Sequence, residues 1–223
     1  MLLLQFSTSH YCRKVRLALG YKKISFAVEN LTPGAHLLRV KPLTGLNTVP
    51  VLLPQQAGEP EAIADSTAIF HYLEQICPEP SWQCGESHTL QTQVNLLEDW
   101  LDESIGTATR FVYYHFRAGA GKSIDPSLAS QMVIQVVRWQ YGITETAVKQ
   151  AQCRLEQAMV ILGHWQDQPY LVGNQLTLAD LTAAALLSPL ALIPEYRQSY
   201  PWLFHRIGEI HHQCGEPLPP GLS

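Results

Sequence analysis

The densest group of reactive side chains lies directly after the first apolar run of the chain. Within Ser7–Val15 the sequence places three aliphatic hydroxyls, a phenol and a thiol at Ser7, Thr8, Ser9, Tyr11 and Cys12. The apolar spacing that follows predicts a helix, and the free N–H groups at the amino end of a helix favour an anion. Lowering the pKa of a thiol by two units needs about 2.7 kcal/mol, which a hydroxyl hydrogen bond and a helix dipole can supply. Taken alone, Ser9 is equally an ordinary N-cap.

A second polar helix start follows at Asp65–Ser66–Thr67, directly before a helix marked by one apolar face: Ile69, Tyr72, Leu73 and Ile76. A ligand carboxylate fits the free N–H groups there, and Asp65 is placed to hold an ammonium group. The alternative is again a simple cap. Val49–Pro50 precedes a strand, and because X-Pro bonds are cis in only about one case in twenty, this dipeptide is a weak signal by itself.

Short apolar runs and amphipathic segments alternate over residues 1–77. We predict strands at residues 2–6, 25–28, 49–53 and 61–64, and helices at residues 12–21 and 69–76. The first two strands, joined through a helix, should be parallel, and the last two should form a hairpin around Gly58–Pro60. The order βαβ-α-ββα predicts a thioredoxin-like α/β domain that carries both polar helix starts.

Residues 88–223 show almost only helical periodicity, and the proline-rich stretch 78–87 suits a linker. Helical spacing joins Val94, Leu97, Leu101 and Ile105 on one segment and Leu155, Ala158, Met159 and Leu162 on another. Thr177–Asp180 forms a capping box, with Leu176 and Leu181 placed as a hydrophobic staple. We therefore expect an all-helical second domain, in which the capping box serves folding alone.

Composition excludes several classes of function. The 223 residues are 46% apolar and 15% charged, with a net charge of −4, so nucleic acid and anionic lipid are not expected partners. Five cysteines without regular spacing suggest neither a disulfide framework nor a zinc site, and the nine histidines stand beside no metal-binding motif. With no signal peptide or membrane span recognisable, we expect a soluble, cytoplasmic protein without a metal or cofactor.

The conjunction of these features resembles the cytosolic glutathione S-transferases over essentially the whole chain. Ser9–Val15 is similar to the S-x-P-C-R-x-V signature of the serine-type classes, theta and delta, and overall similarity also suggests the bacterial chi class. The resemblance implies that Ser9 activates the thiol of reduced glutathione, a co-substrate. It departs from the family pattern in three places: Tyr11 replaces proline, Asp65 replaces Glu or Gln, and Lys41–Pro42 stands in a remodelled stretch.

The resemblance also implies the remaining binding residues. Val49 would pair its backbone with the cysteinyl part of glutathione across a cis Pro50, Asp65 and Ser66 would receive the γ-glutamyl end, and His36 would meet the glycine carboxylate. The second substrate would be a small hydrophobic electrophile. Its pocket would be lined by Tyr11, Tyr113, Tyr114 and Arg117. The resemblance and the aromatic-rich helices near the linker further imply a homodimer.

Two other functions stay open. One is a glutathione-dependent peroxidase or thioltransferase using Cys12, since Ser9–Cys12 also resembles a glutaredoxin motif whose first cysteine has become serine. The other is a non-catalytic relative that binds glutathione or apolar ligands. For thiol activation itself, Tyr11 and Ser7 are rivals of Ser9.

Overall fold

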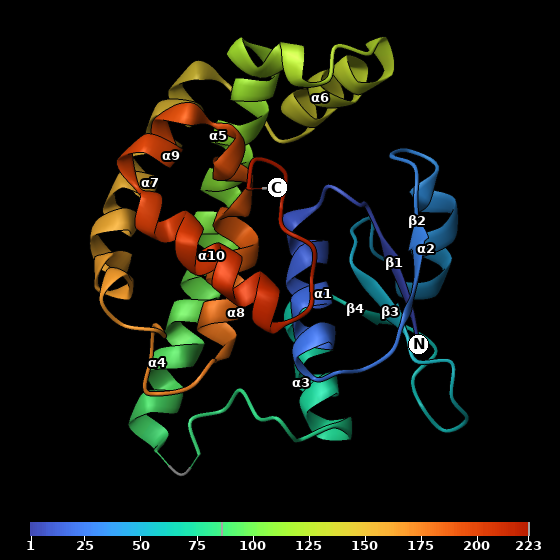
Figure 1. Ribbon diagram of the computed structural model, residues 1–223. Coiled ribbons are helices and arrows are strands. Elements are labelled where there is room, and N and C mark those ends of the chain that lie inside the picture. Colours follow the sequence, from blue (N-terminus) through green and yellow to red (C-terminus); the bar gives the residue numbers. More distant parts are fainter. Residues whose placement is uncertain (86, 223) are drawn as a thin grey trace. The chain divides into compact units, whose positions relative to one another are not determined.

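The structure is a computed structural model that describes residues 1–85 and 87–222 (Figure 1). Packing divides the chain into two compact units. The first comprises Met1–Trp82 and Ile210–Pro217, and the second comprises Gln83–Glu209 and the residues from Leu218 onward. The first unit thus extends beyond residue 77 and takes in a segment from near the end of the chain, which the sequence pattern does not indicate.

The first unit has the expected element order. It runs β1 (Leu2–Gln5), α1 (His10–Tyr21), β2 (Ala27–Asn30), α2 (His36–Thr44), β3 (Val51–Leu53), β4 (Ile63–Ala64) and α3 (Ser66–Ile76). The strand order is β2-β1-β3-β4, with β1 and β2 parallel and the other two pairs antiparallel. The thioredoxin-like prediction is confirmed.

Three of the four strands begin two residues later than predicted: β2 at Ala27, β3 at Val51 and β4 at Ile63. β2 begins at Ala27, whose N–H donates to the carbonyl of Met1, and not at Ser25. The residues before Ser25 instead close the end of α1. Lys23 has φ of 56°, and the Ile24 N–H donates to the carbonyl of Leu19. The apolar character of residues 25–28 does not by itself show that Ser25 lies before the first residue of β2.

Alternation along the strands divides the core of the first unit into two layers. Leu4, Val51 and Leu53 pack with Val40 of α2 in one buried cluster. Leu3, which pairs with Leu52, has its side chain on the opposite face because successive strand residues alternate. The paired helices α1 and α3 cover that face, and α2 covers the other (Figure 1).

The segment Ile210–Pro217 is held to α1 by a close backbone approach. A Cβ on Gly20 would lie 2.0 Å from the carbonyl oxygen of Cys214, so only glycine permits this contact. Arg16 Nε donates to Glu216 Oε1 at 2.6 Å, and Arg16 Nη1 donates to Gln5 Oε1 at the same distance. These contacts bind the segment to the first unit.

The second unit is helical, as predicted. It contains α4 (His88–Asp99), the π-helix η1 (Trp100–Ile105), α5 (Gly106–Ala118), η2 (Ala120–Ile124), α6 (Leu128–Gln140), α7 (Glu145–Ile161), η3 (Leu162–Gln166), α8 (Leu178–Leu187), η4 (Ser188–Leu192) and α9 (Pro194–Ser199). The last helix, α10 (Pro201–Gln213), begins in this unit and ends in the first. No helix in the described part of the chain is long and apolar enough to cross a membrane.

Helix α8 forms the centre of the second unit, because every one of its residues is buried. It packs against α4, η1 and α5. The predicted capping box is present at its start: the Asp180 carboxylate accepts from the Thr177 N–H at 2.8 Å and from the Thr177 hydroxyl at 2.7 Å. Leu176 and Leu181, the predicted staple, are both buried.

Candidate functional site

The polar loops singled out in the sequence meet at one end of the sheet in the first unit. Leu4 of β1 pairs with Val51 of β3, and Val51 pairs in turn with Ala64 of β4. This row places the end of β1, the start of β3 and the end of β4 side by side. The loops carrying Ser9, Val49–Pro50 and Asp65–Ser66 therefore converge there, although about 55 residues separate the first from the last.

Ser9 is the N-cap of α1 and is half-buried. Its N–H donates to the carbonyl of Phe6 at 3.0 Å, which turns the chain from strand into helix. Its Oγ accepts from the Cys12 N–H at 3.3 Å, a long hydrogen bond. The hydroxyl also hydrogen-bonds the Cys12 side chain. It must turn away from that sulfur to donate its hydrogen to an anion at the amino end of the helix.

Cys12 is unsuited to be a nucleophile. The side chain is completely buried in the first turns of α1. Burial raises the pKa of the thiol, although a hydrogen bond from Ser9 and the nearby arginines oppose that shift. Since thiolates react and buried thiols remain protonated, this environment fits a packing cysteine.

Asp65 caps α3 in a strained conformation. Its Oδ1 accepts from the Thr67 N–H at 2.8 Å and from the Ala68 N–H at 3.2 Å. Its backbone has φ of 74° and ψ of 135°, a region that favours glycine, and its side chain is exposed. Oδ2 and the N–H of Ser66, the first residue of the helix, remain for a ligand with a cationic and an anionic group.

The Val49–Pro50 peptide bond is cis, as the family resemblance implies. Val49 is half-buried against the cluster formed by Leu4 and Val51. Among residues 1–85 and 87–222, no hydrogen bond engages the backbone N–H or carbonyl of Val49. An extended peptide ligand can therefore pair with it.

His36 lies at the same end of the sheet but already has partners. Its ring packs edge-on against Phe6 with centroids 4.9 Å apart. Nδ1 accepts from the Gly34 N–H at 3.1 Å, so Nε2 carries the proton and donates to the carbonyl of Asn47 at 3.1 Å. In this arrangement neither ring nitrogen is left for a ligand carboxylate. Sequence analysis did not identify Phe6 and Asn47, because their role depends on contacts that no local pattern encodes.

The aromatic residues predicted for the second substrate form a cluster on α5 of the second unit. Arg117 Nη1 donates to the Tyr113 hydroxyl at 2.7 Å, and the rings of Tyr113 and Tyr114 meet edge to face at 5.2 Å. Burial raises the pKa of Tyr114 to about 12, so its phenol stays protonated. Arg117 also lies 3.8 Å from Asp125. These side chains hold one another in place.

A separate hollow of about 360 Å³ lies at the other end of the sheet, around the β3–β4 turn. Its lining mixes one basic group with acidic, amide and apolar groups: Arg39, Leu43, Leu53, Gln55, Gln56, Glu59, Pro60 and Glu61. None of the predicted site residues contributes to it. The described residues contain no cluster of three or more His, Cys, Asp or Glu that would hold a metal ion.

Comparison with known families agrees with this geometry. Residues 3–81 match the profile "Glutathione S-transferase, N-terminal domain", and residues 127–201 match "Glutathione S-transferase, C-terminal domain". The chain belongs to the cytosolic glutathione S-transferase superfamily. The N-terminal match contains Ser9, Val49 and Asp65, and therefore all three converging loops. A search of curated protein sequences found no significant match.

Solved structures of this superfamily share the fold. A glutathione S-transferase from Rhodospirillum rubrum F11 is 21% identical, with 99% of this chain and 89% of that chain covered and a TM-score of 0.71. Human glutathione transferase theta-2, solved with glutathione and an unknown ligand, is 22% identical, with coverages of 96% and 82% and a TM-score of 0.69. The beta-etherase LigF from Sphingobium sp. strain SYK-6 is 20% identical, with coverages of 99% and 96% and a TM-score of 0.71.

Proposed function

We propose that this protein is a glutathione transferase of the serine type that joins reduced glutathione to small hydrophobic electrophiles. The observation that carries the proposal is the convergence of Ser9, Val49 and Asp65 at one end of the sheet. Val49 offers a free backbone edge to the cysteinyl part of glutathione. Asp65 and Ser66 offer a carboxylate oxygen and an N–H group to the ammonium and carboxylate of the γ-glutamyl end.

The Ser9 hydroxyl stabilises the thiolate by donating its hydrogen to sulfur, while the thiol proton passes to solvent. The sulfur lone pair then forms a bond to the electrophilic carbon, and a leaving group departs with the electron pair of the bond that breaks. Where the electrophile is an unsaturated acceptor, the electron pair instead moves onto the acceptor and is protonated. Rate enhancement comes from thiolate stabilisation and from proximity of the two substrates. No metal or cofactor besides glutathione is needed for this reaction.

A thioltransferase or peroxidase that relies on Cys12 is less well supported, because that thiol is completely buried and its pKa is raised. A purely binding relative would keep the glutathione contacts and lack a group that acts on sulfur. Ser9 separates the two cases, since its hydroxyl stands at the helix end and can turn from Cys12 to the sulfur of glutathione. For the electrophile, the proposed contact residues are Tyr11 in the first unit and, in the second unit, the α5 cluster of Tyr113, Tyr114 and Arg117.

We further propose a cytoplasmic homodimer of two 25.0 kDa chains. The five cysteines are all free, in keeping with a reducing compartment. The dimer rests on membership in the superfamily and on the aromatic helices near the linker.

The test is the pH profile of conjugation of an aryl halide or isothiocyanate. In Ser9→Ala we expect the acidic limb of the rate profile to move to higher pH, with a rate at neutral pH lower by about 10²-fold if two pKa units of thiolate stabilisation are lost. Glutathione affinity, measured by titration, should stay within several-fold, because the hydroxyl touches sulfur and little else.

A matched control is available in the same loop. Ser7→Ala removes an exposed hydroxyl and should keep the profile and rate of the unmodified protein. Tyr11→Phe keeps the ring of a proposed electrophile contact, so the KM for the electrophile can change, but the position of the acidic limb should stay the same. An unchanged profile and rate in Ser9→Ala would reduce Ser9 to a helix cap. A shift in Tyr11→Phe or Ser7→Ala would then transfer thiol activation to that residue.

A further inference from the structure

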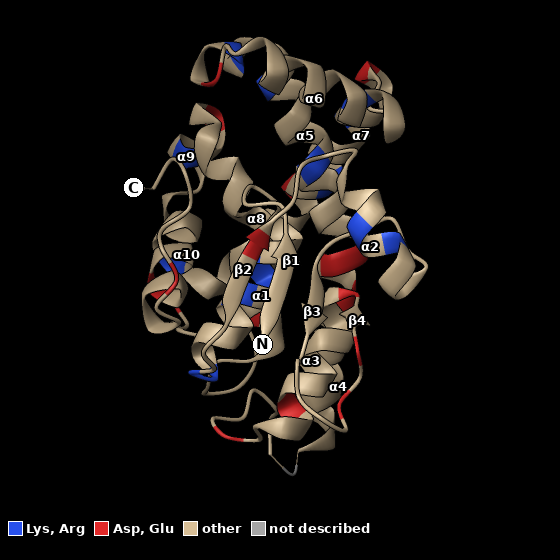
Figure 2. Ribbon diagram, turned by 90° about the vertical axis from the view of Figure 1, so that its right-hand side faces the viewer, with Lys and Arg blue, Asp and Glu red and all other residues tan. Residues whose placement is uncertain are grey.

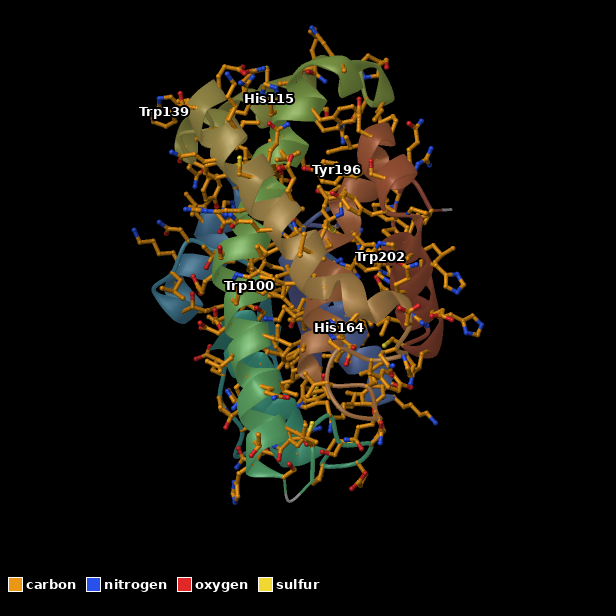
Figure 3. All side chains as sticks on the ribbon, turned by 90° about the vertical axis from the view of Figure 1, so that its left-hand side faces the viewer. Trp100, His115, Trp139, His164, Tyr196 and Trp202 are labelled. Atoms are coloured by element: carbon orange, nitrogen blue, oxygen red, sulfur yellow. The ribbon has the colours of Figure 1, made fainter. Side chains whose placement is uncertain are left out.

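Helix α6 in the second unit presents an apolar face to solvent. Four large side chains remain mostly accessible: Leu128 is 84% exposed, Met132 69%, Val136 57% and Trp139 85%. Figure 3 shows Trp139 projecting away from the neighbouring helices. We refer to these four residues as the α6 apolar face.

The four residues form one continuous stripe. At 3.6 residues per turn, positions 128, 132, 136 and 139 fall within an arc of about 80° and extend over about 17 Å of helix. Ile134, the only buried residue of α6, lies on the opposite side of the helix, toward α5. A helix anchored on one side by a single buried residue and apolar on the other lacks a partner for that second side.

The exposed area is large for a single helix. From the exposed fractions, the four side chains present on the order of 600 Å² of apolar surface, comparable with the largest patch on a typical monomer. A standard protein interface buries about 800 Å² on each partner. The α6 apolar face therefore supplies most of the area that one side of a stable interface requires.

The charge pattern selects the occupant. Arg138 is the only charged residue of α6, and the rest of this helix is tan in Figure 2. By helical position, Gln131, Gln135 and Gln140 border the stripe. Helices that lie on membranes carry rows of Lys or Arg on their polar side, and an acidic or basic peptide would need opposite charges here. An equally uncharged surface is the best match, and a second copy of this chain provides one.

We propose that the α6 apolar face is a contact between two copies of this chain, paired antiparallel across a two-fold axis near Ile134. In that register Leu128 meets Trp139 of the second copy, and Met132 meets Val136 of the second copy. Every contact then occurs twice, as two-fold symmetry requires, and the two helix dipoles oppose each other favourably. The contact uses none of the residues assigned to glutathione.

Sedimentation equilibrium of the full chain at micromolar concentration tests the proposal. We expect the double variant Met132→Glu/Trp139→Glu to have half the mass of the unmodified protein, because a buried pair of carboxylates opposes the contact. This halving is expected whether the unmodified assembly contains two copies or four. Val160→Glu is the matched control, since Val160 is 82% exposed near the end of α7 and outside the stripe, and it should leave the mass unchanged.

A second measurement covers the case in which two charges disturb folding. In a Cys153→Ser background, Met132→Cys/Val136→Cys should form a covalent dimer on mild oxidation, whereas Thr146→Cys/Gln150→Cys, at the same spacing on exposed α7, should not. An unchanged mass in the folded double glutamate variant, or equal crosslinking in both cysteine pairs, would overturn the proposal. So would an unchanged mass accompanied by a raised KM for an apolar electrophile, which would assign the face to substrate.

Discussion

The two helices that begin with an aspartate and a hydroxyl residue, α3 and α8, use the same chemical groups in opposite ways. At α8 the Asp180 carboxylate is completely buried and accepts from the Thr177 N–H, the Thr177 hydroxyl and the Leu171 N–H, the last at 2.7 Å. At α3 the Asp65 carboxylate is exposed and accepts two backbone N–H groups through one oxygen. One carboxylate is saturated within the fold and the other is not.

The backbone conformations of the two N-cap residues, Thr177 and Asp65, also differ. Thr177 has φ of −124° and ψ of 175°, ordinary extended values, whereas Asp65 has φ of 74°. A conformation of that kind costs about 1–3 kcal/mol and persists only where the surroundings impose it. The comparison teaches that a helix cap is a candidate ligand site when it combines exposure, unused acceptors and strain, and a folding device when its carboxylate is buried and fully bonded.

The largest expected effect is on the stability of the second unit. Asp180→Ala should lower the free energy of unfolding by about 3 kcal/mol, because three buried donors lose their acceptor at once. Denaturant unfolding followed by circular dichroism measures it. Asp65→Ala is the matched variant at α3, and it should cost only about 1 kcal/mol, the usual value of an exposed cap. Equal losses in the two variants would contradict the comparison.

The second-largest expected effect is on glutathione binding. Here the variants at the start of α3 should have the larger effect and those at the start of α8 the smaller. Asp65→Ala and Ser66→Ala should each weaken glutathione binding about tenfold, which corresponds to about 1.4 kcal/mol, and slow the saturated reaction much less. Isothermal titration gives the dissociation constants, and melting curves report the loss of the cap. Both residues are expected to contact the γ-glutamyl end, away from sulfur.

Two controls sharpen that result. Asp180→Asn, where folded, should leave glutathione affinity unchanged. Asp65→Gly accepts φ of 74° without strain but lacks the carboxylate, so it should be more stable than Asp65→Ala and bind glutathione equally weakly. Unchanged dissociation constants in Asp65→Ala and Ser66→Ala would remove the site assignment.

Much of this comparison could be predicted from sequence, because caps and strand patterns are local. The strands and helices of the βαβ-α-ββα order and the capping box at Thr177–Asp180 depend on residues within a few positions of one another. The cis bond before Pro50 came only from the family resemblance, because the dipeptide alone is a weak signal. The convergence of the three loops was implied only by the family resemblance, which assigned Ser9, Val49 and Asp65 to one molecule of glutathione.

The features that escaped prediction depend on distant contacts. The membership of Ile210–Pro217 in the first unit rests on Gly20 and Arg16, nearly 200 residues earlier in the chain. The partners of His36 arise from Phe6 and Asn47, which approach it only in the folded sheet. The strain at Asp65 is invisible in sequence because an aspartate before a helix ordinarily has extended geometry.

The smallest expected effect is a pH dependence of stability produced by the buried carboxylate of Asp180. Burial raises the pKa of Asp180 to about 6, although hydrogen bonds from Leu171 and Thr177 oppose the shift, while the unfolded chain has a value of about 3.9. The folded state therefore holds the proton more tightly. The stabilisation this gives is complete below about pH 4 and is lost as the pH rises through about 6.

Between about pH 7 and about pH 5, protonation of Asp180 should raise the free energy of unfolding by about 1 kcal/mol. Other groups titrate in the same range, so the measured quantity is the difference between the unmodified protein and Asp180→Asn, in which no proton is taken up at this position. As the pH falls, the free energy of unfolding of the unmodified protein should rise relative to that of Asp180→Asn. A constant difference for Asp180→Asn would mean that the three hydrogen bonds keep the carboxylate ionised across this range. At the start of α8, the stabilisation of the charged form by these hydrogen bonds would then exceed the cost of burying it.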